Sequence, residues 1–405
     1  MTNKLAKYTT LFILLLVAST ALSEPVMRIR EIREPVFAHP AIVKAGDSFP
    51  MEIMLPEDLE LTQVSLVGVN DTGLQANLDF KAVGKKKELT VFAATVPSGT
   101  PVALYNLTAS FGQYSWDTQL HAVKVIDEFK DEFDFVHLTD IHFNVQHVKN
   151  KNMTLIRQKL LQDVSKQNPE FVLLSGDLGL DPETYDRDYV QAFDMLSKWL
   201  TVPVYIVPGN HEMYTTKMED GREINGLEFW QSAYGPTYHS FDYGKFHFTG
   251  INTYDWPAKY RNRRDKENGF YGTVINAMIS PTQAKWIQKD LEDAYNNGKT
   301  IIAYTHIPIE TLMGGRKIGM PQVKVPGPST ERFIELLTRA GCTNLFVGHM
   351  HYNEIKQFDK LTEILTKAAG IGGGEPYSWG YRIVHLKNGK IADYDKMYEI
   401  GFDDL

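Results

Sequence analysis

The stretch Phe346-Val-Gly-His-Met-His-Tyr-Asn353 is a run of strand-forming residues that ends at a glycine and continues with two histidines one residue apart. Residues i and i+2 of an extended segment point in the same direction, so His349 and His351 could converge on one site. Such a pair has two readings: half-buried imidazoles that each bind a nearby carbonyl oxygen, or two ligands of a metal ion. The pair alone does not decide between them. A metal site requires further ligands from elsewhere in the chain.

Side chains of the metal-binding type also follow several other strand-like segments. They are Asp140 and His142 in LTDIHF, Asp177 in SGD, Asn210, His211 and Glu212 in PGNHE, and His306 in YTHIP. In open α/β sheets, active sites lie just outside the carboxyl ends of the strands. A single aspartate at a strand end is usually a turn residue. Five segments with nitrogen or oxygen ligands at the same topological place instead predict one shared site.

Residues 24–128 read as short strands separated by turns. The segments SFPMEIMLP, TQVSLVGV, QANLDFKAV, ELTVFAATV, VALYNLTASF and TQLHAVKVI alternate or run apolar, and no helical period intervenes. Strands at this spacing predict an all-β, immunoglobulin-like sandwich. No cluster of His, Asp and Glu occurs in it, so we expect an accessory domain, whose partner the sequence does not identify. The charged segment 126–134 reads as a linker.

Residues 129–405 change to an alternation of strands and helices. Helices are predicted for the amphipathic segments RQKLLQDVSKQ, YVQAFDMLSKWL, SPTQAKWIQKDLEDAYNNG and STERFIELLTRAG. The third begins with a capping box formed by Ser280 and Gln283. Near the end of the chain, Asn388-Gly389 is typical of a β-hairpin turn. The alternation predicts an α/β architecture in which helices cover sheets.

In their order along the chain, these motifs resemble those of the calcineurin-like metallophosphoesterases. That family carries D-x-H, G-D, G-N-H-E/D, a histidine after a strand, and G-H-x-H, and the resemblance covers about residues 133–385. It implies a four-layer αββα sandwich for residues 129–405 and two metal ions bridged by Asp177. The implied ligands are Asp140, His142, Asp177 and His351 for one metal, and Asp177, Asn210, His306 and His349 for the other.

The residue types agree with a binuclear metal centre. Carboxylate, amide and imidazole ligands without a thiolate suit Fe, Mn or Zn. Two such metals about 3.5–4 Å apart can hold a bridging hydroxide, which attacks a phosphate ester in line, and can clamp the attacking and leaving oxygens. The resemblance gives His211 the role of general acid, which fits a side chain that titrates near neutrality. Glu212 is expected to support the ligands rather than to react.

We therefore expect a binuclear-metal hydrolase acting on a phosphorylated small molecule or a phosphodiester. Two alternatives stay open: a phosphodiesterase or nucleotide pyrophosphatase of the same fold, and a non-catalytic surface-binding protein with a degenerate hydrolase domain. Asp177 is not followed by the V-D-R-G of the serine/threonine phosphoprotein phosphatases, which argues against a protein phosphatase of that class. Purple acid phosphatases have D-x-G and a tyrosine ligand at the positions of His142 and Leu180, so no tyrosinate-to-iron colour is expected.

Three segments could shape the substrate pocket. The loop 255–272 carries four basic residues, Lys259, Arg261, Arg263 and Arg264, which could contact the substrate phosphate or simply be solvated. Tyr377 and Trp379 in GGGEPYSWGY could line the rim or pack inside. The segment 310–329 is long and rich in Gly and Pro, as a lid or specificity loop can be.

The chain begins with the features of a secretory signal. Lys4 and Lys7 precede an apolar run from Leu11 to about Leu22, and small residues stand just before Glu24. The run is shorter than the ~20 residues that a transmembrane helix needs. We expect residues 1–23 to be cleaved as a signal peptide, no transmembrane anchor in the mature chain, and export to a periplasm or to the extracellular space.

Composition sets two further limits. The formal net charge of −8 at pH 7 argues against non-specific nucleic-acid binding, which depends on cationic contacts to phosphates. The single cysteine, Cys342, excludes an internal disulfide, so the fold must depend on its hydrophobic core.

Overall fold

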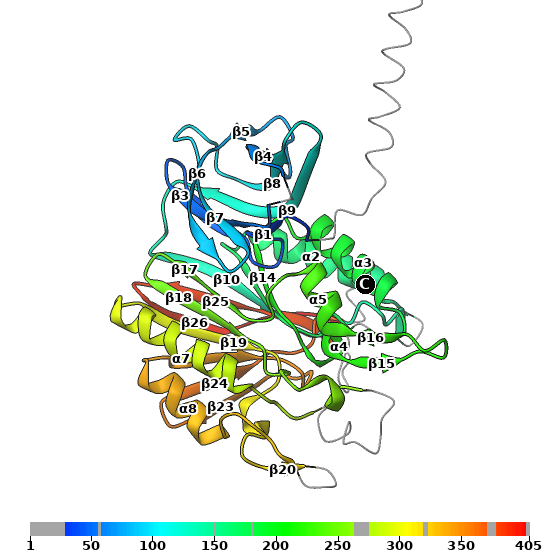
Figure 1. Cartoon of the computed structure of the whole chain (residues 1–405). Helices are drawn as coiled ribbons and strands as arrows, with labels where there is room; N and C mark the ends of the chain where they lie inside the picture. The colour runs from blue at the N-terminus through cyan, green and yellow to red at the C-terminus, as the bar shows by residue number, and fades with distance from the viewer. Residues whose placement is uncertain are drawn as a thin grey trace, which may run out of the picture.

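The structure, a computed structural model, describes residues 29–55, 58–148, 151–179, 181–262, 275–318, 323–370 and 378–401. These residues form a β-sandwich followed by a larger α/β unit (Figure 1). The predicted signal peptide, residues 1–23, lies outside the described residues. The predicted fold class, an all-β sandwich followed by an α/β sandwich, is confirmed.

The N-terminal sandwich consists of two sheets that enclose one core. One sheet has the order β1 (Ile32–Glu34), β3 (Ser48–Ile53), β7 (Leu89–Thr95), β6 (Asp79–Lys86). The other has the order β2 (Ala41–Lys44), β9 (Ser115–Ile126), β8 (Ala103–Phe111), β4 (Leu61–Gly68), β5 (Gln75–Asn77). In β8, Leu107, Ala109 and Phe111 are buried and alternate with half-exposed polar residues, as expected for strands with one face in a core. The immunoglobulin-like character of the sandwich stays a prediction.

The α/β unit contains two larger mixed sheets. The first has the order β14 (Val204–Val207), β13 (Val172–Ser175), β10 (Glu132–Leu138), β25 (Ser378–Lys387), β26 (Lys390–Gly401). The second has the order β17 (His239–Tyr243), β18 (Phe246–Ile251), β19 (Thr300–Thr305), β22 (Asn344–Val347), β24 (Leu361–Leu365), β23 (Glu354–Phe358). Three short hairpins are β11 (His147–Val148) with β12 (Lys151–Asn152), β15 (Thr215–Lys217) with β16 (Glu223–Asn225), and β20 (Lys317–Ile318) with β21 (Val323–Lys324).

The two sheets pack face to face and helices cover their outer faces, which gives four layers. An aromatic-rich core that includes Phe135, Phe171 and Phe248 fills the space between the sheets. The outer face of the first sheet packs against α2 (Met153–Gln167), α3 (Tyr185–Trp199) and α5 (Gly226–Ala233). The outer face of the second sheet packs against α7 (Pro281–Asn296) and α8 (Thr330–Arg339) on the opposite side of the unit (Figure 1).

The four predicted helices are present as α2, α3, α7 and α8. At the start of α7, the Ser280 hydroxyl accepts a hydrogen bond from the Gln283 backbone N–H at 3.2 Å, as the capping pattern predicts. Asn388 and Gly389 have φ values of 52° and 73°, which a two-residue type I′ turn requires, and they join β25 to β26. Within the described ranges, no helix combines the length and the apolar character needed to cross a membrane.

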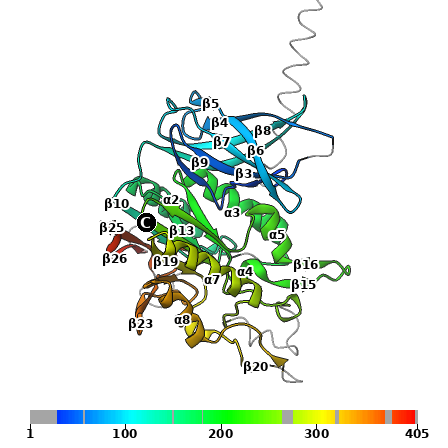
Figure 2. The ribbon, with the colours of Figure 1, turned by 60° about the vertical axis from the view of Figure 1, so that its left-hand side comes forward.

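The sandwich lies against the α/β unit (Figure 2), and residues 29–40 contact both. The backbone N–H of Ile206 in the edge strand β14 donates to the Ala38 carbonyl at 3.0 Å. Phe37 is buried in the same core as α3 and α5, with its ring 4.9 Å from that of Phe193 and 6.4 Å from that of Tyr234. The segment therefore protects a sheet edge and gives the two units a shared core.

We expect Phe37→Ala to destabilise the sandwich and the α/β unit together. Truncation of a well-packed phenylalanine costs about 3–5 kcal/mol, because it removes apolar contacts and leaves a cavity. Chemical denaturation followed by tryptophan fluorescence should show one transition, moved to lower denaturant. Tyr114→Ala is the control, since this side chain is 82% exposed and should leave the midpoint unchanged. Two separate transitions, of which only one moves, would contradict the shared core.

Candidate metal centre

The predicted site residues meet at one edge of the two sheets. Strands β10, β13 and β14 run parallel in the first sheet, and β18, β19, β22 and β24 run parallel in the second. The segments that follow β10, β13, β14, β19 and β22 carry the predicted residues. Carboxyl ends of parallel strands lie at the same edge, so five loops from two sheets converge there.

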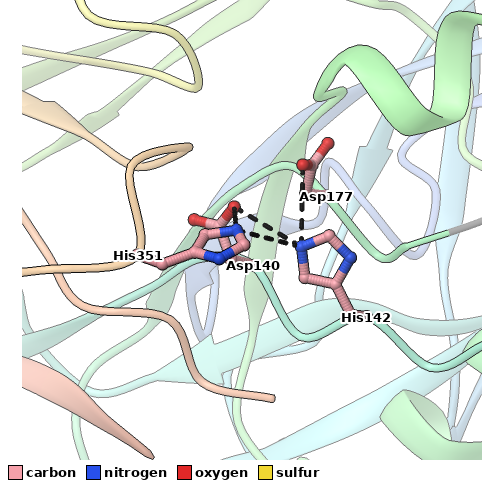
Figure 3. Close-up of side chains that lie close together, drawn as sticks. All are labelled: Asp140, His142, Asp177 and His351. Atoms are coloured by element: carbon pink, nitrogen blue, oxygen red, sulfur yellow. Dashed lines mark hydrogen bonds and ion pairs between the residues drawn. The ribbon is translucent and has the colours of Figure 1, made fainter. Parts of the chain in front are cut away.

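A first group of ligand atoms comes from Asp140, His142, Asp177 and His351, and one atom of each lies within 4.8 Å of the others (Figure 3). Nε2 of His351 lies 3.1 Å from Oδ1 of Asp140 and 3.3 Å from Nε2 of His142. Nε2 of His142 lies 3.7 Å from Oδ2 of Asp177. We call these four residues the first ligand group.

A second ligand group consists of Asp177, Asn210, His306 and His349. Nε2 of His306 lies 3.2 Å from Oδ2 of Asp177 and 3.1 Å from Oδ1 of Asn210. It lies 3.2 Å from Nδ1 of His349. The same oxygen of Asp177, Oδ2, therefore faces both groups.

Metal binding explains the arrangement of the two ligand groups better than hydrogen bonding alone does. Two ligands roughly 2.1 Å from a shared metal, at tetrahedral or octahedral angles, lie about 3.0–3.4 Å apart. The spacings of 3.1–3.3 Å around His306 and His351 lie in this range, and those from His142 to the two aspartates are longer, at 3.7 Å. Oδ1 of Asp140 is buried and has no hydrogen-bond donor, although it is surrounded by imidazole nitrogens. Buried carboxylate oxygens are nearly always partnered, so this atom is well placed to bind a cation.

Neighbouring groups fix which ligand atoms face the cluster. Oδ2 of Asp140 accepts from the Thr139 hydroxyl at 2.6 Å and from the His349 backbone N–H at 2.8 Å, which leaves Oδ1 for the cluster. Nδ1 of His306 donates to the Ser175 carbonyl at 2.7 Å, so in the neutral ring Nε2 carries the lone pair. Hydrogen bonds of this kind orient metal ligands and raise their basicity.

The histidine pairs do not converge in the way that an extended strand would bring them together. Asp140, His142, Asp177, His349 and His351 all have left-handed backbones, with φ between 50° and 73°. His349 and His351 also belong to different ligand groups. The prediction that the side chains of each pair could converge assumed an extended backbone. That assumption is wrong, because these residues are left-handed. Left-handed residues other than glycine are costly, and their concentration here is typical of a functional site.

Glu212 supports the site through the backbone, as predicted. Its buried carboxylate accepts hydrogen bonds from the N–H groups of Asp177 at 2.9 Å, Gly179 at 3.2 Å and Gly209 at 2.8 Å. It thereby ties together the loops after β13 and β14. Gly209 must lack a side chain, since a Cβ there would lie 2.2 Å from Oδ1 of Asp177.

The protein groups of the site carry strongly perturbed pKa values. Burial disfavours the charged form of His306, but the carboxylates of Asp177 and Asp140 outweigh this effect and raise its pKa to about 9. Burial also works against ionised Asp177, yet the surrounding histidines hold its pKa well below the usual range. Burial and the neighbouring Asp177 charge raise the pKa of Glu212 to about 8. The cluster therefore favours positive charge between its carboxylates.

His211 lies beside the cluster and is not one of the ligands. Its ring centroid is 5.1 Å from that of His142, and its side chain is half-buried. Its backbone N–H donates to Oδ1 of Asp177 at 3.1 Å, so the residue is anchored through its main chain. The carbonyl of His211 accepts from the Tyr185 hydroxyl.

The predicted substrate contacts Arg263, Arg264 and Tyr377 lie outside the described residues. Arg261, in the same basic loop, is buried and donates to the Met213 carbonyl and to Asn225, so it supports the fold.

Sequence reasoning missed Arg157 of α2. This buried guanidinium donates to the carbonyls of Ile141, Phe143 and Gly370, and so holds the loop that carries Asp140. No sequence signal marked it, because an arginine on an amphipathic helix usually faces solvent.

The four-layer fold and the clustered nitrogen and oxygen ligands are those of a metal-dependent phosphoesterase. A family model described as calcineurin-like phosphoesterase matches residues 133–353, more than half of the chain. The chain belongs to the calcineurin-like phosphoesterase family, as the order of its motifs predicted.

Two similar solved structures come from phosphatases. A dimetal phosphatase from Danio rerio has 14% identity and a TM-score of 0.48, over 67% of this chain and 99% of its own. A purple acid phosphatase from yellow lupin (Lupinus luteus) seeds has 13% identity and a TM-score of 0.47, over 88% of this chain and 73% of its own. A comparison with curated protein sequences gives no match. The family assignment therefore depends on the family model.

The raised pKa of His306 predicts pH-dependent metal binding. A metal ion needs the neutral imidazole, and this ring holds a proton below its pKa of about 9 when only protein groups surround it. Binding should therefore release a proton. The affinity for Mn²⁺ should fall by up to about tenfold per pH unit as the pH falls from about 9 to 6. Calorimetric titration in buffers of different ionisation enthalpy measures both effects. Affinity that does not change with pH would contradict the prediction.

Proposed function

We propose that the chain is an exported binuclear-metal phosphoester hydrolase. Its first metal is held by the first ligand group and its second metal by the second ligand group. The observation that carries the proposal is the position of Asp177 Oδ2, which faces His142 of one group and His306 of the other. A carboxylate within reach of both groups would suit a pair of neighbouring metals. The ligand chemistry suits Fe, Mn or Zn.

When bound, two such cations would lower the pKa of water to generate a nucleophile and would stabilise the attacking and leaving oxygens of an in-line displacement. The protein groups have separate tasks. Asp140 and Asp177 supply the negative charge that retains the cations. Thr139 and Ser175 orient Asp140 and His306 through hydrogen bonds. Glu212 fixes the loops after β13 and β14, so that the ligands keep their spacing.

We assign His211 as the general acid that protonates the leaving oxygen. Its ring stands next to His142 at the edge of the cluster, and its backbone is fixed by Asp177. An imidazole can carry a proton near neutral pH and deliver it to a developing alkoxide.

The substrate in this proposal is a phosphorylated small molecule or a phosphodiester. Two divalent cations exceed the charge of Asp140 and Asp177, so the site would attract an anionic phosphate even in an acidic protein. Comparing p-nitrophenyl phosphate with bis-p-nitrophenyl phosphate on metal-reconstituted protein separates a monoesterase from a phosphodiesterase or nucleotide pyrophosphatase. Hydrolysis of neither ester would favour a surface-binding protein.

Asp177→Asn should remove both metals. The substitution keeps the shape of the side chain but removes the charge that both ligand groups share, so both sites should weaken and activity should nearly vanish. Metal content per chain after dialysis is the measurement. Asp117→Asn is the control, because Asp117 is equally buried but binds the Ile32 backbone N–H in the sandwich, and it should keep two metals. Two tightly bound metals in Asp177→Asn would overturn the bridging role.

His211→Ala should keep its metals and lose turnover in a way that depends on the leaving group. Alanine retains the backbone N–H that binds Asp177, so the metal content should not change. Without a general acid, kcat for an alkyl phosphate should fall by about 10²–10⁴. The loss for p-nitrophenyl phosphate should be much smaller, because p-nitrophenolate leaves without protonation. Equal losses on both esters, or a loss of metal, would contradict the assignment.

A further inference from the structure

The side-chain amide of Asn210 has two different ends, and only one of them can bind a cation. Oδ1 carries lone pairs, whereas Nδ2 carries two donor protons. In the structure Oδ1 faces the second ligand group, 3.1 Å from Nε2 of His306. A half-turn of the amide would present Nδ2 in nearly the same shape and would repel a metal. The orientation of this amide therefore needs a specific partner.

That partner is Tyr214. Its hydroxyl oxygen lies 2.5 Å from Nδ2 of Asn210 and accepts a hydrogen bond from it. Asn210 begins the short helix α4 (Asn210–Met213), and Tyr214 stands directly after its last residue, one turn further along the chain. Both side chains are only 2% exposed, so no solvent replaces this contact. A buried amide N–H without an acceptor is costly.

The position of Tyr214 is fixed by contacts that do not involve its hydroxyl. Its ring lies 5.2 Å from that of His211 and 5.9 Å from that of Tyr254. Its carbonyl accepts from the Gly226 backbone N–H at 2.9 Å. Phenylalanine would keep these ring and backbone contacts, so Tyr214→Phe removes the hydroxyl alone.

We propose that Tyr214 is a positioning residue for the second metal: its hydroxyl holds the Asn210 amide with the oxygen toward the cation. The inference rests on the proposed binuclear function and names one residue that sets the metal affinity of the second site. Groups that orient metal ligands typically contribute about 10–100-fold to metal affinity. The effect should be confined to the second ligand group, because Asn210 does not belong to the first.

Titration of metal-free protein with Mn²⁺, followed by calorimetry and by the electron paramagnetic resonance of free Mn²⁺, tests the proposal. Wild type should bind two ions. Tyr214→Phe should bind the first with unchanged affinity and the second about 10–100-fold more weakly. Tyr189→Phe is the control: this tyrosine is also buried, but it lies in the core beneath the first sheet, and its hydroxyl is bonded to the carbonyls of Glu212 and Gly226. It should bind both ions as wild type does.

A double-mutant comparison separates orientation of the amide from a general loss of structure. In Asn210→Asp both ends of the side chain are oxygens, so the site no longer depends on which end faces the metal. Adding Tyr214→Phe to Asn210→Asp should therefore cost much less second-site affinity than Tyr214→Phe costs alone. An equal cost in both backgrounds would overturn the positioning role.

The outcomes also distinguish this inference from the proposed function. Wild-type protein that binds fewer than two Mn²⁺ ions would overturn the binuclear site and the role of Tyr214 with it. Two ions in wild type and an unchanged second affinity in Tyr214→Phe would overturn the role of Tyr214 alone. A weakened first ion would also count against it, because Asn210, which the hydroxyl binds, belongs to the second group.

Discussion

The site depends on one electrostatic constraint, the burial of acidic side chains close to one another. Asp140, Asp177 and Glu212 are all buried, and Glu212 accepts a hydrogen bond from the Asp177 backbone N–H. Like charges in a medium of low dielectric repel strongly unless positive charge lies between them. The protein meets this need partly with backbone N–H groups and partly with imidazoles, which surround the positions that cations would take. The same constraint explains why hydrogen bonds tie together the loops that carry these side chains.

The packing of the two sheets makes this burial possible. Large aromatic side chains fill the space between them and hold the ends of β10, β13 and β14 opposite those of β19 and β22. Each ligand group draws residues from both sheets, and Asp177 belongs to both groups. A shift of one sheet against the other would therefore disturb both groups at once. The aromatic core therefore helps to keep both ligand groups in place.

The sequence predicted most of the architecture and the ligand candidates, because both depend on local signals. Strand runs, capping residues and the Asn388-Gly389 turn act over a few positions, and the ligand motifs follow strands directly. What it missed depends on contacts between distant residues. Arg157 has carbonyl partners that only the folded loops bring together. Phe37 lies in a segment without a clear period, so nothing indicated that it enters the core of the second unit.

The strand order of the first sheet has a consequence for synthesis of the chain. The seven candidate ligand residues are complete once His351 has been made. Strand β10, which precedes the first of them, pairs with β25 and therefore waits for residues 378–387. Trp379 and Tyr381 of that strand also complete the core beneath α2 and α3. Pairings between distant segments form late, whereas the sandwich can close as soon as β9 has emerged. A nascent or C-terminally shortened chain can thus contain every candidate ligand residue and still lack the sheet that keeps them in place. Metal binding would therefore be expected only after β25 has been made.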